Sequence, residues 1–280
     1  MVPGTPRATP PLPQHHLLAH CSDLHVGRPG ADEAARALCA QLLREGVDHL
    51  LVTGDLVHSG RVDEFERFME IFAAFGGRMT VVPGNHDRIG RGVAHLLMGG
   101  DAVRVDTPPG LYVVRVDTSG PHNRNPRVAH GELPASTLRQ LDRALDAAPQ
   151  GLLVVVAFHH HLIPTPEDSV AERWVHRLGL VTEHEVPGGY RLLELARGRA
   201  DLLLHGHRHR PAASVLASGT ARPLGVYNAG SSTELCRARL FRHCGGKLLS
   251  EPGWSQAARP RPTPGPRWMH SVRAVTTMFL

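Results

Sequence analysis

Short apolar runs alternate with amphipathic stretches along the first half of the chain. Residues 17–22 form an apolar run typical of a buried strand, and apolar residues then recur at helical spacing over 32–45 until Gly46 ends the pattern. The same order repeats, with a strand predicted at 48–53, an amphipathic helix at 62–75 and a strand at 79–82. This alternation predicts stacked β-α units and therefore an α/β fold.

The second half begins in the same way and then changes character. An apolar run at 111–116, a helix at 135–148 and strands at 152–158 and 201–204 continue the alternation. After Pro211 the pattern predicts only short strands, at 213–216, 224–227, 235–241 and 247–249. We therefore expect the end of the chain to add antiparallel strands.

The two ends differ in composition from the rest, which shows no internal repeat and no long linker. Residues 1–14 are rich in proline, and the tail of residues 252–280 opens with a segment rich in proline and arginine. Such segments bury too little apolar surface to order themselves. We therefore predict a single domain over residues 15–251, with a flexible segment at either end.

Composition narrows the class of protein. Of 280 residues, 41% are hydrophobic and 20% charged, which is ordinary for a globular protein, and the formal net charge of +5 tolerates an anionic partner without requiring one. The scattered cysteines form no CxxC pair, which indicates reduced thiols. The longest apolar run, residues 152–158, is far short of the roughly 20 residues of a membrane helix, and the N-terminus lacks a secretory apolar region. We expect a cytoplasmic protein.

Polar clusters follow five of the predicted strands: Asp23-Leu24-His25, Gly54-Asp55, Gly84-Asn85-His86-Asp87, His159-His160-His161 and Gly206-His207-Arg208-His209. In open α/β sheets ligands bind at the carboxyl ends of the strands, so these clusters can converge in one crevice. Residues two apart on an extended chain point to the same side, and a preceding glycine permits a sharp turn. Oxygen and imidazole donors without thiolate suit manganese, iron or zinc.

Each cluster alone has a simpler interpretation. With 20 histidines in the chain, one HxH triplet is unremarkable, Asp23 and His25 can be a capping pair, and Asn85 can be a turn residue. Only the recurrence of the clusters at five strand ends argues for a site. We interpret the histidines away from these strand ends as core or solvated side chains: His15, His16, His20, His49, His95 and His176.

The five clusters, in this order, resemble the motifs of the calcineurin-like metallophosphoesterase family over roughly residues 17–251. The resemblance implies two packed mixed β-sheets flanked by helices, a four-layer α/β/β/α sandwich. A spacer of Gly131-Glu132-Leu133 with Leu138, Gln140 and Leu141 is closest in pattern to the class III cyclic nucleotide phosphodiesterase branch. That branch varies widely in substrate.

The resemblance also implies a role for each residue. Asp23, His25 and His209 would hold one divalent metal ion, Asn85, His159 and His207 a second, and Asp55 would bridge them at about 3.5–4 Å, with a hydroxide between the ions as nucleophile. His86 would stabilise the transition state or protonate the leaving oxygen, and Asp87 would orient its ring. The third histidine cluster reads HHHLIP where the family usually has HHPP or HHHP, which leaves His159 and His160 as alternatives; alignment on Pro164 favours His159.

The resulting hypothesis is a dinuclear-metal-dependent hydrolase of phosphoesters, a phosphodiesterase on a small phosphorylated compound such as a cyclic nucleotide. One alternative is a DNA nuclease of the repair type, which we disfavour because the chain leaves little length for a DNA-binding cap. Another is a non-catalytic scaffold that keeps the fold without the metals. Between the metal-bearing strands, residues 163–189 are expected to form a specificity rim that carries Arg173, Trp174, His176, Arg177 and His184.

Overall fold

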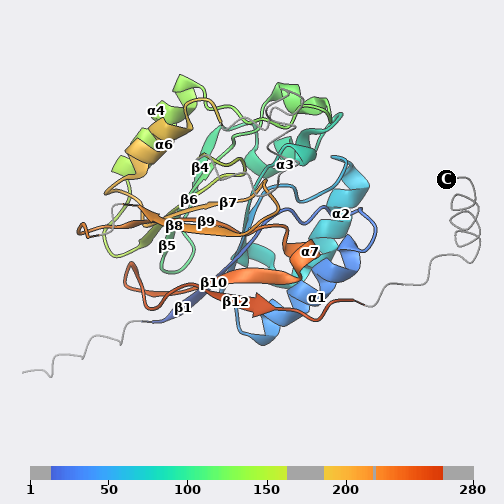
Figure 1. The fold of residues 1–280 in the computed structure, drawn as a ribbon, viewed down its shortest axis with the longest axis horizontal. Helices are drawn as coiled ribbons and strands as arrows, with labels where there is room; N and C mark the ends of the chain where they lie inside the picture. The colour runs from blue at the N-terminus through green and yellow to red at the C-terminus, as the bar shows by residue number, and fades with distance from the viewer. Residues whose placement is uncertain (1–13, 163–185, 217–218, 261–280) are drawn as a thin grey trace, which may run out of the picture.

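The computed structural model describes residues 14–162, 186–216 and 219–260, and its core is a pair of six-stranded sheets (Figure 1). The first sheet has parallel strands β1 to β3, as the β-α alternation predicts, and β10 runs antiparallel to β1. Its strands, in spatial order, are β11 (Lys247–Leu248), β10 (Arg237–Cys244), β1 (His16–Cys21), β2 (His49–Thr53) and β3 (Met79–Val82), with β12 (Gly253–Gln256) paired to β10.

The second sheet has four parallel strands between two antiparallel edge strands. In spatial order they are β4 (Val103–Asp106), β5 (Leu111–Val116), β6 (Leu153–Ala157), β7 (Leu202–His205), β9 (Leu224–Asn228) and β8 (Ala212–Leu216). The carboxyl ends of β6 and β7 therefore point the same way. The predicted antiparallel addition at the end of the chain is confirmed by β8, β10 and β11. The predicted strand at 224–227, β9, instead pairs in parallel with β7.

Helices cover the outer face of each sheet. Helices α1 (Ala31–Arg44) and α2 (Val62–Ile71) pack on the first sheet, and α4 (Ala135–Asp146) and α6 (Gly189–Ala196) on the second (Figure 1). The predicted fold class, two mixed sheets flanked by helices, is confirmed. The short helical turns are α3 (Ala94–Met98), α7 (Ser232–Leu235), η1 (Ala73–Arg78), η2 (His86–Arg88) and η3 (Pro121–Arg124).

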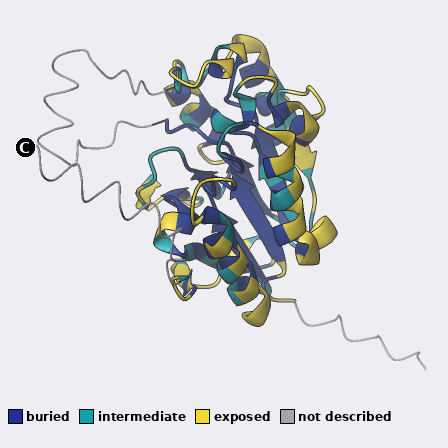
Figure 2. Cartoon of the chain, turned by 90° about the vertical axis from the view of Figure 1, so that its right-hand side faces the viewer, coloured by how far each residue is buried: buried dark blue, intermediate teal, exposed yellow. Residues whose placement is uncertain are grey.

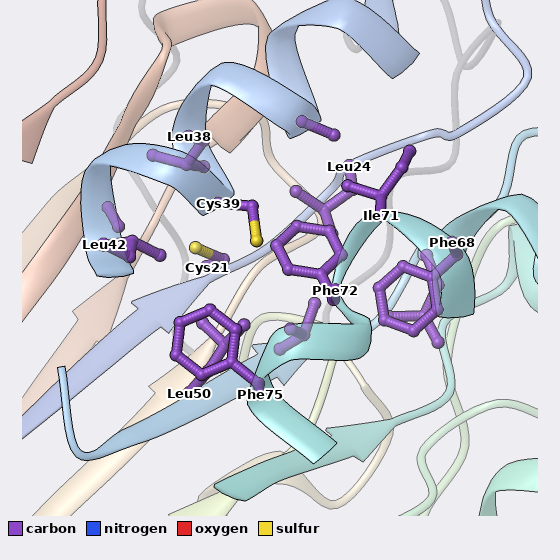
Figure 3. Packing of buried hydrophobic residues seen from close by; sticks show 14 of the residues in the cluster. Cys21, Leu24, Leu38, Cys39, Leu42, Leu50, Phe68, Ile71, Phe72 and Phe75 are labelled. Carbon is purple, nitrogen blue, oxygen red and sulfur yellow. The ribbon is translucent and has the colours of Figure 1, made fainter. Parts of the chain in front are cut away.

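Three apolar clusters fill the spaces between these four layers. In β2, Leu50 packs on the helix side of the sheet in one cluster with Phe72 and Phe75 (Figure 3). Val52 belongs to the same cluster, whereas Leu51 faces the second sheet. The central strands are thus buried on both faces, which explains why they read as continuous apolar runs (Figure 2). Each such buried side chain contributes about 1.5–3 kcal/mol, so the strand ends rest on a stable base.

The predicted boundary at residue 251 is wrong. Residues 253–256 form β12, which pairs with β10, and the N–H of Ala257 donates to Cys236 O at 2.8 Å. The guanidinium carbons of Arg237 and Arg239 lie 4.1 and 4.2 Å from the centroid of the Trp254 ring. Backbone pairing and cation–π contact order this stretch despite its proline and arginine content. The predicted flexible remainder, residues 261–280, lies outside the described residues, as do residues 1–13.

Removal of β12 is therefore expected to destabilise the fold. Truncation after Glu251 removes the strand and its ladder, and at roughly 0.5–1.5 kcal/mol for each hydrogen bond the free energy of unfolding should fall by at least about 2 kcal/mol. Chemical denaturation measures this loss. Truncation after Pro260, which keeps β12, is the matched control; equal stability of the two truncated chains would show that β12 contributes nothing.

Two sequence predictions concern the chain as a whole. All four cysteines lie in the described residues and are free thiols, three of them buried, as their spacing indicates. No helix within residues 14–162, 186–216 and 219–260 combines the length and apolar character needed to cross a membrane. The predicted specificity rim falls almost wholly on residues 163–185, including Arg173, Trp174, His176, Arg177 and His184, outside the described residues.

Candidate metal centre

The five polar clusters converge where the carboxyl ends of both sheets meet. Asp23 and His25 follow β1, Asp55 follows β2, and Asn85 to Asp87 follow β3 in the first sheet; His159 follows β6, and His207 and His209 follow β7 in the second. The N–H of Gly206 donates to His159 O at 3.0 Å, and that of His207 to Asp23 Oδ2 at 3.0 Å. Residues as far apart in sequence as Asp23 and His209 thus share one site.

Five of the predicted ligands have left-handed backbone conformations. Among non-glycine residues of the described chain, positive φ angles occur only at Asp23 (52°), His25 (48°), Asp55 (51°), His207 (76°), His209 (54°) and Cys236 (51°). Aspartate and histidine enter this region more readily than most residues, yet it still costs about 1–3 kcal/mol each. Such strain persists only where the surroundings impose it, which is typical of functional sites.

Hydrogen bonds from neighbouring segments impose these conformations. The N–H of Asp23 donates to Gly54 O at 3.1 Å, and that of His25 to Asp55 O at 2.9 Å. The hydroxyl of Ser231 donates to Asp23 O at 2.9 Å, and that of Thr233 to Leu24 O at 3.0 Å. Ser231 and Thr233 thus fix the loop that carries Asp23 and His25.

Two glycines are required because other groups occupy the space of a side chain. A Cβ atom on Gly206 would lie 1.7 Å from Ser22 Oγ, and one on Gly84 would lie 2.2 Å from Asp55 Oδ1. Both distances are far below van der Waals contact. At these two positions the need for glycine is space rather than a positive φ. The sharp turn expected from glycine occurs at Gly54, whose φ is 85°.

The first donor set consists of Asp23, His25, Asp55 and His209, whose donor atoms all lie within 4.8 Å of one another. The Nε2 atoms of His25 and His209 are 3.0 Å apart, His209 Nε2 lies 3.5 Å from Asp23 Oδ1, and His25 Nε2 lies 3.8 Å from Asp55 Oδ2. Two imidazoles and two carboxylates therefore converge on one point, a donor set that suits a divalent transition metal.

The second donor set lies on the other side of Asp55. Asn85 Oδ1 is 3.2 Å from His159 Nε2 and 3.1 Å from His207 Nδ1, and His159 Nε2 is 3.4 Å from Asp55 Oδ2. The same oxygen of Asp55 is thus near both His25 and His159. A carboxylate between two donor sets is the arrangement that the sequence predicts for a bridging ligand.

The structure distinguishes the geometry of His159 from that of His160. The Nδ1–H of His159 donates to Thr53 O at 2.7 Å, which leaves Nε2 facing Asp55 and Asn85. In contrast, His160 Nδ1 lies 2.8 Å from Thr118 Oγ1. Metal-binding histidines commonly use one nitrogen for a backbone carbonyl and the other for the ion. The geometry therefore favours His159, as alignment on Pro164 does.

The two buried carboxylates of the site, Asp23 and Asp55, are stable as anions only beside a positive charge. Burial raises the pKa of Asp23 above its usual value. For Asp55 burial acts in the same direction, but His159 holds its pKa well below the usual value. Burial opposes charge on His159, yet Asp55 and Asp23 raise its pKa to about 10. Without a cation, a proton on His159 balances the carboxylates, so the donor set fits divalent ions electrostatically.

The predicted role of Asp87 as the group that orients His86 is wrong. The Nδ1–H of His86 donates to the backbone oxygen of His58 at 2.7 Å. The buried Asp87 carboxylate instead accepts from the N–H groups of Val57 at 3.1 Å and Gly84 at 2.8 Å, and burial, aided by Asp55, raises its pKa to about 7. Asp87 therefore ties the loop after β2 to the loop after β3.

His86 occupies the exposed side of the site, beside an imidazole that the sequence did not single out. Its ring stacks on that of His58, with centroids 5.6 Å apart and planes at 21°, and lies edge-on to His25 at 4.6 Å. The side chain of His209 is 35% exposed, whereas those of Asp23 and His159 are fully buried. The site is therefore reached from the His86 and His209 side. The only signal for His58 was its place three residues after Asp55.

The fold and the converging donors define a phosphoesterase architecture, and the sequence comparison agrees. The model of the calcineurin-like phosphoesterase family matches residues 16–211. The chain belongs to this family.

Two curated relatives are phosphodiesterases by name. The chain is 29% identical to the 3',5'-cyclic adenosine monophosphate phosphodiesterase CpdA of Pseudomonas aeruginosa. The alignment spans 186 residues, which are 61% of this chain and 63% of the relative. It is also 33% identical to the glycerophosphodiester phosphodiesterase GpdQ of Enterobacter lignolyticus. That alignment spans 81 residues, which are 25% of this chain and 29% of the relative. The matches thus span less than two thirds of these relatives.

Solved structures support the fold. A dimetal phosphatase from Danio rerio superposes with a TM-score of 0.59 at 14% identity, over 87% of this chain and 99% of that one. A 5'-nucleotidase precursor from Thermus thermophilus gives a TM-score of 0.56 at 16% identity, over 94% of this chain and 58% of that one. At these identities the similarity establishes the architecture of two packed sheets.

Proposed function

We propose that this chain is a dinuclear-metal-dependent hydrolase of phosphoesters, acting as a phosphodiesterase on a small phosphorylated compound. The observation that carries the proposal is the position of Asp55, whose Oδ2 lies 3.8 Å from His25 Nε2 in one donor set and 3.4 Å from His159 Nε2 in the other. A single carboxylate can neutralise part of the charge of two cations at once. Membership of the calcineurin-like family supports this assignment.

We assign the ligands as the family resemblance implies. Asp23, His25 and His209 would hold one ion, Asn85, His159 and His207 the other, and Asp55 both. Oxygen and imidazole donors are compatible with manganese, iron or zinc. When bound, two such ions supply Lewis acidity toward phosphoryl oxygens and lower the pKa of water.

His86 is proposed to supply a proton to the leaving oxygen. Because its Nδ1–H is held by His58 O, the opposite nitrogen, Nε2, is the one left for a substrate. The ring is half-buried at the exposed side of the site, so a leaving group can depart past it into solvent. A positioned acid of this kind contributes about 10²–10⁴-fold to the rate.

The names of the curated relatives favour a small diester as substrate. One relative is named for cyclic AMP and the other for glycerophosphodiesters, and both compounds are diesters of low molecular weight. Neither name describes a nuclease. A diester also requires a proton donor for its alkoxide leaving group, which suits the proposed role of His86.

A substrate panel with metal counting tests the proposal. Purified protein is supplied with Mn²⁺ and offered cyclic nucleotides, other phosphodiesters, nucleotide-sugar pyrophosphates and single-stranded DNA. We expect two bound ions and turnover of a small diester. A protein that binds no metal and stays inert in Mn²⁺ would instead be a scaffold, and preferential cleavage of DNA would establish the nuclease alternative.

Paired substitutions test the ligand assignment in the histidine run. His159→Ala is expected to lose one of two bound ions and nearly all turnover, because Nε2 of His159 faces Asp55 and Asn85. His160→Ala is the matched control and should keep both ions, because the Nδ1 of His160 contacts Thr118 instead. Metal content by mass spectrometry decides between them, and the reverse result would assign the ligand to His160.

A further inference from the structure

A second group of histidines lies beside the proposed dinuclear centre. Donor nitrogens of His25, His58 and His86 all lie within 4.8 Å of one another. The ring of His58 is stacked on His86 and is edge-on to His25 at 5.7 Å between centroids. His58 and His86 are half-buried, so an ion has access to the group from solvent. In this group, unlike the first donor set, every donor is an imidazole.

The backbone holds His58 firmly in this position. Its N–H donates to Val26 O at 3.0 Å, and Val57 forms an isolated parallel bridge with Val26. Asp87 accepts from the N–H of Val57 on the other side. The segment after β2 is therefore fixed between the loops that carry His25 and His86.

Hydrogen bonding also selects the nitrogens that remain for a ligand. In a neutral His86 ring the proton lies on Nδ1, which donates to His58 O, so Nε2 carries the free lone pair. Histidine ligands of metal ions are commonly oriented in this way by a backbone carbonyl. The backbone oxygen of His58 thus orients His86 so that its Nε2 can bind a metal ion, and the ring of His58 is stacked on that of His86.

A buried imidazole nitrogen of this group lacks a hydrogen-bond partner. Nδ1 of His58 has no partner among the described residues. Buried imidazole nitrogens usually find a partner, because an unsatisfied one costs about 1–3 kcal/mol. A bound cation would satisfy a nitrogen of this kind.

We propose that His25, His58 and His86 form a third cation site, specific for Zn²⁺ or a similar borderline ion. A set of three imidazoles with an open fourth position matches the ligand number of zinc, and nitrogen-only donors favour Zn²⁺, Ni²⁺ and Cu²⁺ over Mn²⁺ and Mg²⁺. His25 belongs to both this set and the first donor set. Occupation of the third site therefore competes with the first.

This competition has a consequence for catalysis that rests on the proposed function. An ion on His86 Nε2 occupies the nitrogen proposed to carry the proton, and it also draws His25 away from Asp55 and His209. Excess Zn²⁺ is thus expected to inhibit the manganese-loaded protein, and His58→Asn should weaken that inhibition as a fraction of its own uninhibited rate. Equal fractional inhibition of the two proteins would contradict this consequence.

Direct binding tests the site without reference to activity. The full-length Asp23→Asn variant, in which the first donor set has lost a carboxylate, is titrated with Co²⁺ as a spectroscopic substitute for Zn²⁺. Four-coordinate Co²⁺ absorbs visible light strongly, whereas six-coordinate Co²⁺ absorbs weakly. We expect Co²⁺ to bind and to absorb strongly. In the double variant that also carries His58→Asn, the Co²⁺ affinity should fall at least roughly 10- to 100-fold, the loss that follows even when a group that only hydrogen-bonds a metal ligand is removed.

Two further variants make the result specific. His58→Phe keeps an aromatic ring against His86 and should lose the ion as His58→Asn does. His122→Asn, which removes a partly exposed imidazole that is not a member of the group, should bind Co²⁺ as the Asp23→Asn parent does. Unchanged Co²⁺ affinity in both His58 variants, or an equal loss in His122→Asn, would overturn the third site.

Discussion

Asp55→Ala is expected to abolish hydrolysis and to empty at least one of the two metal positions. Its carboxylate lies between both donor sets, so its removal deprives two cations of the charge between them. It also leaves the N–H of His86, which donates to Asp55 Oδ1 at 2.9 Å, without its acceptor. Turnover should fall by at least about 10³-fold, the upper range for loss of a single electrostatic contact in an active site.

Asp55→Asn separates the two effects of this change. The amide oxygen can still accept from the N–H of His86, whereas the negative charge is gone. We expect both variants to lose metal, measured as ions per chain by mass spectrometry. Asp55→Asn should retain the hydrogen bond to the N–H of His86, and with it the conformation of the loop after β3. Two bound ions in Asp55→Ala would remove Asp55 from the bridging role.

His86→Ala should retain both ions and lower turnover of an alkyl phosphodiester by about 10²–10⁴-fold. The other seven residues fill the two donor sets, so the ions do not depend on His86. The deficit should shrink for a nitrophenyl ester, because nitrophenolate leaves without a proton. If His86 only stabilised charge on the phosphoryl group, its removal would lower the turnover of both esters by the same factor.

The measurement is kcat for the two esters in the wild type and in His86→Ala, with metal content determined in parallel. Mn²⁺ is the ion of choice, because the nitrogen-only set that includes His86 discriminates against it. Equal losses on the two esters would reject the role as an acid and favour charge stabilisation. Loss of an ion would show that His86 supports the donor sets.

The sequence predicted the central strands well because those strands have both faces buried. Strand β6 is an uninterrupted apolar run and β2 has an apolar centre, and both lie within a residue of the predicted bounds. The edge strand β4 gave no such signal: its sequence, VRVD, is half polar and largely exposed. Strand β12 was missed because proline and arginine around it concealed a pairing that depends on β10.

The candidate site was predicted from strand ends, and the details that failed depend on distant contacts. Convergence of Asp23 with Asp55 in the first sheet, and of His159 with His207 in the second, follows from parallel strands, whose carboxyl ends share an edge. That His58 O, and not Asp87, orients His86 depends on how two loops pack, which no periodicity encodes. The neighbours of His58 are likewise set by a bridge between Val26 and Val57.

At the five proposed ligand residues with a left-handed backbone, the backbone conformation favours glycine, whereas the metal centre requires a side chain with a donor atom. Glycine would relax the backbone at Asp23, His25, Asp55, His207 and His209, yet it carries no donor atom. A lineage freed from the need for the centre would gain stability by drifting to glycine at these positions, and a screen for heat resistance alone would reward the same changes. Aspartate and histidine at these positions therefore supply donor atoms at a cost in backbone free energy.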